Sequence, residues 1–167
     1  MEADADALAR AYDRNRDHLA RWDPRREQSF YTVEHQRAVI VRQLREQAEG
    51  RMVRWVLAAE DDVVGVATLS NIIFGAFRSA DLGYWIDDSH LGRGLATGAV
   101  NAICAYANRK IALHRVAAGT LIHNVRSQRV LAKCGFQQYG LAPRYLYIDG
   151  QWQDHLRFQK ILNSDPA

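Results

Sequence analysis

The first third of the chain has apolar residues at helical spacing. Between residues 5 and 20 they recur every three to four positions, at Leu8, Ala11, Tyr12 and Leu19, which places them on one face of a helix. Pro24 disfavours helical geometry in the residue before it, so this helix should end by Asp23. A second apolar stripe predicts a helix over residues 33–48, with Thr32 as its N-cap.

The rest of the chain alternates between strands and helices. Runs rich in β-forming residues predict strands at 52–60, 63–73, 80–87, 112–122, 136–148 and 151–161. Helical patterns cover residues 94–108 and the segment from Asn124 to Cys134, which Gly135 would terminate. Asp61-Asp62 and Asp149-Gly150 are expected to form hairpin turns, and the second pair is the stronger signal.

This order of elements predicts the fold class. Two helices precede three strands joined by tight turns, and helices then separate most of the later strands. We therefore expect an α/β fold with a mixed, mostly antiparallel sheet and helices on both faces. The sequence contains no linker, repeat or low-complexity segment, so residues 1–167 are predicted to form one domain.

Composition narrows the class of protein. The 167 residues are 48% hydrophobic and 25% charged, as in soluble globular proteins. There is no apolar run of about 20 residues and no signal-peptide pattern, so we expect a cytoplasmic protein without membrane spans. Cys104 and Cys134 fall on apolar helix faces and are expected to be core thiols. The net charge of +3 is spread along the chain, so no nucleic-acid partner is predicted, and no metal site is expected.

Residues 82–97 carry the clearest chemical signal. A buried strand leads into a loop with Gly92 and Gly94 and then into a helix, an arrangement that holds phosphate through backbone N–H groups. A Walker A loop would need Lys and Ser or Thr where Leu95 and Ala96 stand. A dinucleotide fingerprint would need glycine at Thr97 and an acid roughly 20 residues later. A pyrophosphate-binding turn of another kind remains.

Several motifs resemble one family. Residues 83–86 (GYWI), 91–97 (LGRGLAT), 124–136 (NVRSQRVLAKCGF) and 145–155 (YLYIDGQWQDH) are similar to the GCN5-related N-acetyltransferases. Within that family they resemble the branch of ribosomal-protein N-terminal-alanine acetyltransferases, over roughly residues 8–162. The resemblance implies acetyl-CoA as cofactor. It also implies that pantetheine lies between two splayed parallel strands, which here end at Ile86 and Ile122.

The resemblance also implies a set of cofactor-binding residues. Backbone groups of Trp85, Ile86 and Asp87 would pair with pantetheine. The phosphates would be held by the loop residues Leu91, Gly92, Arg93, Gly94, Leu95, Ala96 and Thr97. Leu91 departs from the family's Gln or Arg, and Arg93 could add charged contacts. Asn124, Ser127 and Arg129 would complete the site from the next helix.

The catalytic candidates are Ser127, Asp81 and His155. Ser127 lies one helical turn after Asn124 and would act as the acid toward the sulfur, because the family's alternative tyrosine position is Leu131. Asp81 is the first candidate for the general base. His155 is the second, since its imidazole can titrate near neutral pH. Some relatives instead have a glutamate in the segment that here reads 145–147 (YLY).

The acceptor is expected to be a primary amine, either a protein N-terminus or a small molecule. An α-amine has a pKa near ~8 and a lysine near ~10.4, so an α-amine needs less help from a base. The protein would act as a monomer or homodimer. Alternatives are a non-catalytic acyl-CoA-binding module, a transferase of another acyl group and, from the pI of about 9.0, a nucleic-acid-binding domain. Either an acceptor cleft or packing against the sheet would explain Trp22, Arg25, Tyr31, Phe74 and Phe77.

Overall fold

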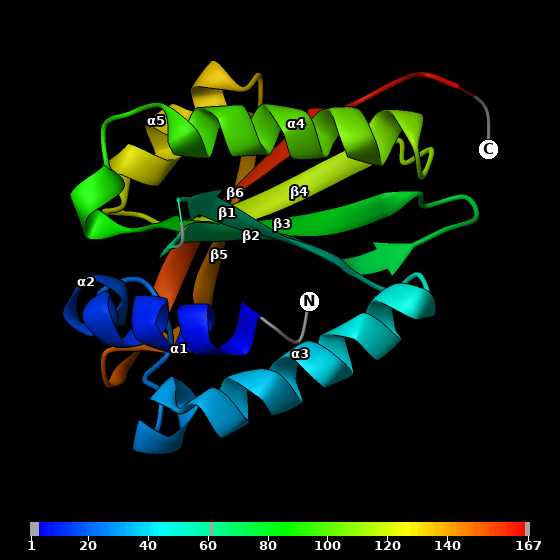
Figure 1. The fold of residues 1–167 in the computed structure, drawn as a ribbon. Helices are drawn as coiled ribbons and strands as arrows, with labels where there is room; N and C mark the ends of the chain where they lie inside the picture. Colours follow the sequence, from blue (N-terminus) through cyan, green and yellow to red (C-terminus); the bar gives the residue numbers. More distant parts are fainter. Residues whose placement is uncertain (1–3, 61, 166–167) are drawn as a thin grey trace.

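The computed structural model describes residues 4–60 and 62–165, which form a six-stranded sheet with the order β1-β2-β3-β4-β6-β5 (Figure 1). The strands are β1 (Val53–Ala59), β2 (Asp62–Ile73), β3 (Ser79–Ile86), β4 (Arg115–Leu121), β5 (Gln137–Ile148) and β6 (Gln151–Ile161). The pair β3–β4 is parallel, and the other neighbouring pairs are antiparallel. The predicted mixed, mostly antiparallel sheet is confirmed.

Helices cover both faces of the sheet, as predicted. The helices α4 (Leu95–Arg109) and α5 (Val125–Lys133) lie on one face, and α1 (Ala5–Arg14), α2 (Arg16–Ala20) and α3 (Val33–Ala48) lie on the other (Figure 1). The larger core cluster includes Leu82, Val100 and Leu131, and it contains both cysteines as buried free thiols. Among the described residues, no helix is long and apolar enough to cross a membrane.

The prediction of one continuous helix over residues 5–20 is wrong at Asn15. This side chain is 1% exposed, and its Nδ2 donates to the carbonyl of Ala11 at 2.8 Å and to Oδ2 of Asp87 at 2.8 Å. Such side-chain bonds compete with the helical ladder, and α1 and α2 separate there. An unpredicted 3-10 helix spans Gln28–Tyr31. Thr32 caps α3 as predicted, accepting from the amide of His35 at 3.2 Å.

One strand begins later than predicted, and one hairpin turn is confirmed. The strand predicted over 112–122 begins only at Arg115, because Ala112 has a φ of 51° and interrupts extended geometry. Asp149 and Gly150 have φ values of 50° and 78°, the geometry of a tight hairpin turn. The other predicted turn includes Asp61, which lies outside the described residues.

The parallel pair β3–β4 separates towards its C-terminal end. Pairing runs from Ser79 opposite Arg115 to Leu82 opposite Ala118 and does not continue beyond these residues. Beyond this point β3 stays beside β2 as far as Ile86, and β4 stays beside β6 as far as Leu121. The predicted splayed strand pair is therefore present, and the gap lies where α4 and α5 begin.

Candidate active site

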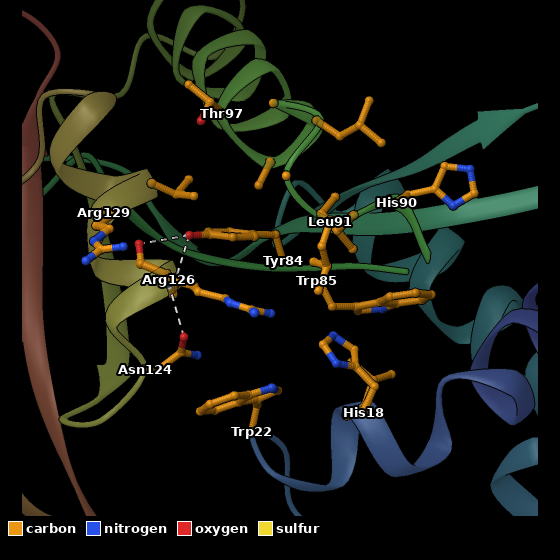
Figure 2. Close-up of a pocket in the computed structure, with 18 of the residues that line it drawn as sticks. His18, Trp22, Tyr84, Trp85, His90, Leu91, Thr97, Asn124, Arg126 and Arg129 are labelled. Carbon is orange, nitrogen blue, oxygen red and sulfur yellow. Dashed lines mark hydrogen bonds between the residues drawn. The ribbon is translucent and has the colours of Figure 1, made fainter. Parts of the chain in front are cut away.

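A cavity of about 580 Å³ lies at this separation of the two strands (Figure 2). Its walls come from α2 and the segment after it, from the end of β3 with the loop before α4, and from α5. The lining residues include His18, Trp22, Asp23, Tyr84, Trp85, Ile86, His90, Leu91, Gly92, Gly94, Leu95, Ala96, Thr97, Asn124, Arg126, Ser127, Arg129 and Lys133. The structure thus brings together segments more than 100 residues apart in the chain.

One end of the cavity is built to hold anions. Gly94 is the N-cap of α4 with a φ of 78°, and within the described residues no side chain caps this helix. The first amides of α4, from Leu95 to Thr97, are therefore open to a ligand. A Cβ built on Gly92 or Gly94 would meet no atom within 4 Å, so the cradle is open. The conformation at Gly94 also favours glycine.

Basic side chains of α5 line the same cavity. Arg126, Arg129 and Lys133 are three and four residues apart, so they share one face of the helix. Arg129 was predicted, whereas Arg126 and Lys133 were missed, although this helical spacing could have identified them. Arg93 is not among the lining residues, because its guanidinium donates to the carbonyl of Ser89 at 3.1 Å. The structure therefore supplies positive charge from α5.

The direction of the backbone groups along β3 limits which residues can contact pantetheine in the gap. The amide of Asp87 donates to the carbonyl of Val64 at 2.9 Å. Because neighbouring residues of an antiparallel strand point their backbone groups in alternating directions, Asp87 and Trp85 face β2, while Ile86 and Tyr84 face the gap. The backbone direction is therefore compatible with the predicted contact at Ile86. It does not fit the predicted backbone contacts at Trp85 and Asp87, whose groups are directed to β2.

The carboxylate of Asp87 is a structural group outside the cavity. It is 2% exposed and accepts hydrogen bonds from Arg14 Nε at 2.7 Å, from Asn15 Nδ2 at 2.8 Å and from the amide of Ser89 at 3.0 Å. Burial alone would raise the pKa of Asp87, but the hydrogen bonds from Ser89, Asn15 and Arg14 outweigh it and hold this pKa well below its usual range. Asp87 thus ties the loop before α4 to the junction of α1 and α2.

The other end of the cavity presents two hydroxyl groups. Asn124 caps α5 by accepting from the amide of Ser127 at 3.1 Å, as its N-cap position predicts. The phenol oxygen of Tyr84 lies 2.9 Å from Ser127 Oγ (Figure 2). Burial is the main reason why the pKa of Tyr84 is raised to about 12, so its phenol is protonated at neutral pH. Sequence reasoning missed this contact, because Tyr84 and Ser127 come from different elements.

Neither predicted base lines the cavity. Asp81 pairs in register with Ala117, before the strands separate, and its carboxylate accepts from Asn71 Nδ2 at 3.0 Å and from Arg157 at 3.4 Å. His155 is 5% exposed, and its ring centroid lies 5.1 Å from that of Tyr145. Burial is the largest cause that lowers the pKa of His155. These positions separate both groups from the cavity and correct the expectation that they lie in it.

Asp23 is the carboxylate found among the lining residues. Burial raises its pKa, partly opposed by Arg26, whose guanidinium is 3.8 Å from the Asp23 carboxylate. Trp22 also lines the cavity, and its ring centroid lies 5.7 Å from that of His123, just after β4. The other residues predicted for the acceptor side do not line the cavity, namely Arg25, Tyr31, Phe74 and Phe77.

Comparisons with known proteins agree with this geometry. Residues 1–137 match the family model of the acetyltransferase (GNAT) domain. The chain is 37% identical to the probable N-acetyltransferase YjcK of Bacillus subtilis (strain 168), over 90% of this chain and 84% of that protein. It is 35% identical to the [ribosomal protein uS5]-alanine N-acetyltransferase of Escherichia coli (strain K12), over 93% of this chain and 81% of that enzyme.

A solved structure shows the same architecture with a coenzyme. The structure of Mycobacterium smegmatis RimJ in complex with CoA-disulfide superimposes with a TM-score of 0.92 at 33% identity, covering 96% of this chain and 78% of that one. The splayed strands, the open glycine cradle and the basic face of α5 fit such a ligand, and together they define an acyl-CoA-binding transferase. The chain belongs to the GNAT acetyltransferase family. It is an N-acetyltransferase with acetyl-CoA as its co-substrate.

Proposed function

We propose that this protein acetylates the α-amine of a protein N-terminus, and that an N-terminal alanine of a ribosomal protein is the model acceptor. The observation that carries the proposal is one continuous cavity. It joins the phosphate cradle at Gly94 to the Ser127 hydroxyl and extends to Trp22 and Asp23. Donor and acceptor can therefore meet in one site. The similarity to an alanine N-acetyltransferase of ribosomal protein uS5 supports the choice of acceptor.

The reaction needs a neutral amine. About a tenth of an α-amine with a pKa near ~8 is neutral at pH 7, compared with well under a thousandth of a lysine side chain near ~10.4. The amine nitrogen attacks the thioester carbonyl carbon, the carbon–sulfur bond breaks with its electron pair on sulfur, and the proton lost by nitrogen finally neutralises the sulfur. A site in which Asp81 and His155 lie outside the cavity suits an acceptor that needs little deprotonation.

Different residues of the cavity bind acetyl-CoA, stabilise the leaving sulfur and accept the proton of the amine. Backbone amides of α4 and the guanidinium of Arg129 hold the phosphates, and the backbone of Ile86 pairs with the pantetheine. Ser127 donates a hydrogen bond to the sulfur as it becomes a thiolate. Asp23 receives the proton of the acceptor amine. Its pKa is raised above the ordinary value of an aspartate, which brings the carboxyl closer to the working pH.

A panel of acceptors tests the proposal. One arm uses a peptide with a free N-terminal alanine and no lysine. The second uses the same peptide with a blocked N-terminus and an internal lysine, and the third uses spermidine. Thiol release from acetyl-CoA is measured, and the modified atom is identified by mass spectrometry. We expect turnover on the first peptide. A preference for spermidine or for the lysine peptide would overturn the proposal.

The variant Ser127→Ala tests the role of the hydroxyl in the same assay. We expect kcat to fall roughly 100-fold with a nearly unchanged KM for acetyl-CoA, because the lost contact is made mainly in the transition state. Ser29→Ala is a matched control, since this serine is exposed and does not line the cavity. Equal kcat values for Ser127→Ala and the unmodified enzyme would remove Ser127 from this role.

A further inference from the structure

We propose that Tyr84 is a positioning residue that directs the hydroxyl hydrogen of Ser127 toward the sulfur of coenzyme A. The inference rests on the role proposed above for Ser127 and adds a second hydroxyl to it. The family resemblance identified Tyr84 only as part of a strand motif. Its side chain reaches the opposite wall of the cavity, where α5 begins.

The geometry sets the two hydroxyl groups in direct contact. The phenol oxygen of Tyr84 is 2.9 Å from Ser127 Oγ and 3.4 Å from the Ser127 carbonyl oxygen. Both side chains line the cavity. The amide of Ser127 donates to Asn124 Oδ1 at 3.1 Å, which fixes the backbone of the serine at the start of α5. The tyrosine therefore meets a hydroxyl whose backbone is already fixed.

The direction of the hydrogen bond between Tyr84 and Ser127 decides which hydroxyl hydrogen remains available to a ligand. Each hydroxyl has one hydrogen and two lone pairs. If the phenol gives its hydrogen to Ser127 Oγ, the hydrogen of the serine is left for a third atom in the cavity. The phenol is half-buried, and its raised pKa keeps it protonated at neutral pH, so this donor is always present. Oγ is closer to the phenol oxygen than the Ser127 carbonyl oxygen is, at 2.9 Å against 3.4 Å, so Oγ is the better placed of these two acceptors for the phenol hydrogen.

The contact with Tyr84 should strengthen the hydrogen bond that Ser127 donates to the sulfur. A serine that accepts one hydrogen bond becomes a stronger donor in the next, because hydrogen bonds in a chain polarise one another. A stronger donor stabilises a thiolate more than a thiol. The pair should therefore lower the pKa of the thiol of bound coenzyme A, even with no acetyl group or acceptor present.

The pKa of the thiol of bound coenzyme A tests the inference. The thiol of coenzyme A bound to the enzyme is titrated by the ultraviolet absorbance of the thiolate, with the unmodified enzyme, Tyr84→Phe, Ser127→Ala and the double variant. We expect each single variant to raise the pKa by about one unit and the double variant to raise it no further than Ser127→Ala alone. We also expect Tyr84→Phe to lower kcat about tenfold with the KM for acetyl-CoA unchanged. Tyr106→Phe is the control, because that ring packs on Trp55.

Three results would overturn the inference. The first is a thiol pKa in Tyr84→Phe equal to that of the unmodified enzyme. The second is a double variant whose effect is the sum of the two single effects. The third is a raised pKa in Tyr84→Phe beside an unchanged one in Ser127→Ala. In the last two cases the tyrosine would act without the serine. The titration uses no acceptor. A failure of the acceptor panel with the expected thiol pKa values would contradict the proposed function and leave the role of Tyr84 supported.

Discussion

The substitution Asp87→Asn tests the group that holds the site together. This carboxylate is 2% exposed and accepts from Arg14, Asn15 and Ser89. Asparagine has nearly the same shape, but it is neutral and places an NH₂ group among these donors. The variant therefore removes the negative charge and one of the two acceptor oxygens without opening a cavity. Arg14 then loses its charged partner, and one of the donors around residue 87 loses its acceptor.

The size of the effect follows from these contacts. Removing one partner of a buried ion pair costs about 3–5 kcal/mol. The Arg14 side chain is 37% exposed, so water replaces part of its interaction with Asp87. We therefore expect a loss of about 3 kcal/mol in the free energy of unfolding. With a urea m-value of about 2 kcal/mol per molar, the midpoint should fall by about 1.5 M.

Urea unfolding followed by circular dichroism measures this difference, with Asp88→Asn as the matched control. Asp88 is the next residue, its side chain is 68% exposed, and it contacts His18 at 3.3 Å, so its substitution should change the free energy of unfolding by less than ~1 kcal/mol. Because the folded-state pKa of Asp87 is depressed, its contribution is present above the unfolded pKa of about 3.9 and is lost as the pH falls below it. The difference between the unmodified protein and Asp87→Asn should shrink there. A loss as small as that of Asp88→Asn at neutral pH would refute the reasoning.

Three further predictions concern the cavity and the core. Gly94→Ala should raise the Kd for coenzyme A about tenfold by calorimetry, since a side chain there costs about 1–2 kcal/mol of backbone strain in the N-terminal loop of α4; Gly98→Ala, within the helix, should leave the Kd unchanged. Asp23→Asn should lower kcat and remove the acid limb of its pH profile, and an unaltered profile would exclude this carboxylate as the base. Burial raises the pKa of Cys104 to about 11 and also raises that of Cys134, so iodoacetamide should label both at least ~100-fold more slowly in the native protein than in urea. Equal labelling rates would contradict their burial.

Local signals in the sequence predicted the fold well. The caps at Thr32 and Asn124 accept the expected amides, and the turn at Asp149-Gly150 forms as its residues favour. Each of these features depends on residues within a few positions of one another, so a pattern along the chain contains the whole cause. The strand and helix order then limited the sheet to a mixed one, and the glycine motif predicted for phosphate binding lines the cavity at the start of α4.

The features that the sequence did not predict depend on contacts between segments far apart in the chain. The interruption between α1 and α2 at Asn15 depends on Asp87, which is 72 residues away. Helical periodicity cannot predict a partner at this distance along the chain. The contact between Tyr84 and Ser127 depends on how far β3 separates from β4. The place of Asp81 on the central strand predicts that it acts as the base. It lies opposite Ala117, where the strands still pair, so only the register shows that it precedes the gap.

Asp87 supports two walls of the cavity, the one proposed to bind acetyl-CoA and the one proposed to face the acceptor. Asp87 holds the loop that leads to the phosphate cradle, and its partners Arg14 and Asn15 lie at the junction that leads through α2 to Trp22 and Asp23. Loosening this support should therefore raise the KM of both substrates together with the loss of stability. Ser127 lies on the far wall, where Asn124 holds its amide, and the phenol of Tyr84 contacts its hydroxyl there. Their variants should lower kcat without this joint change, so kinetics can separate the support of the site from its chemistry.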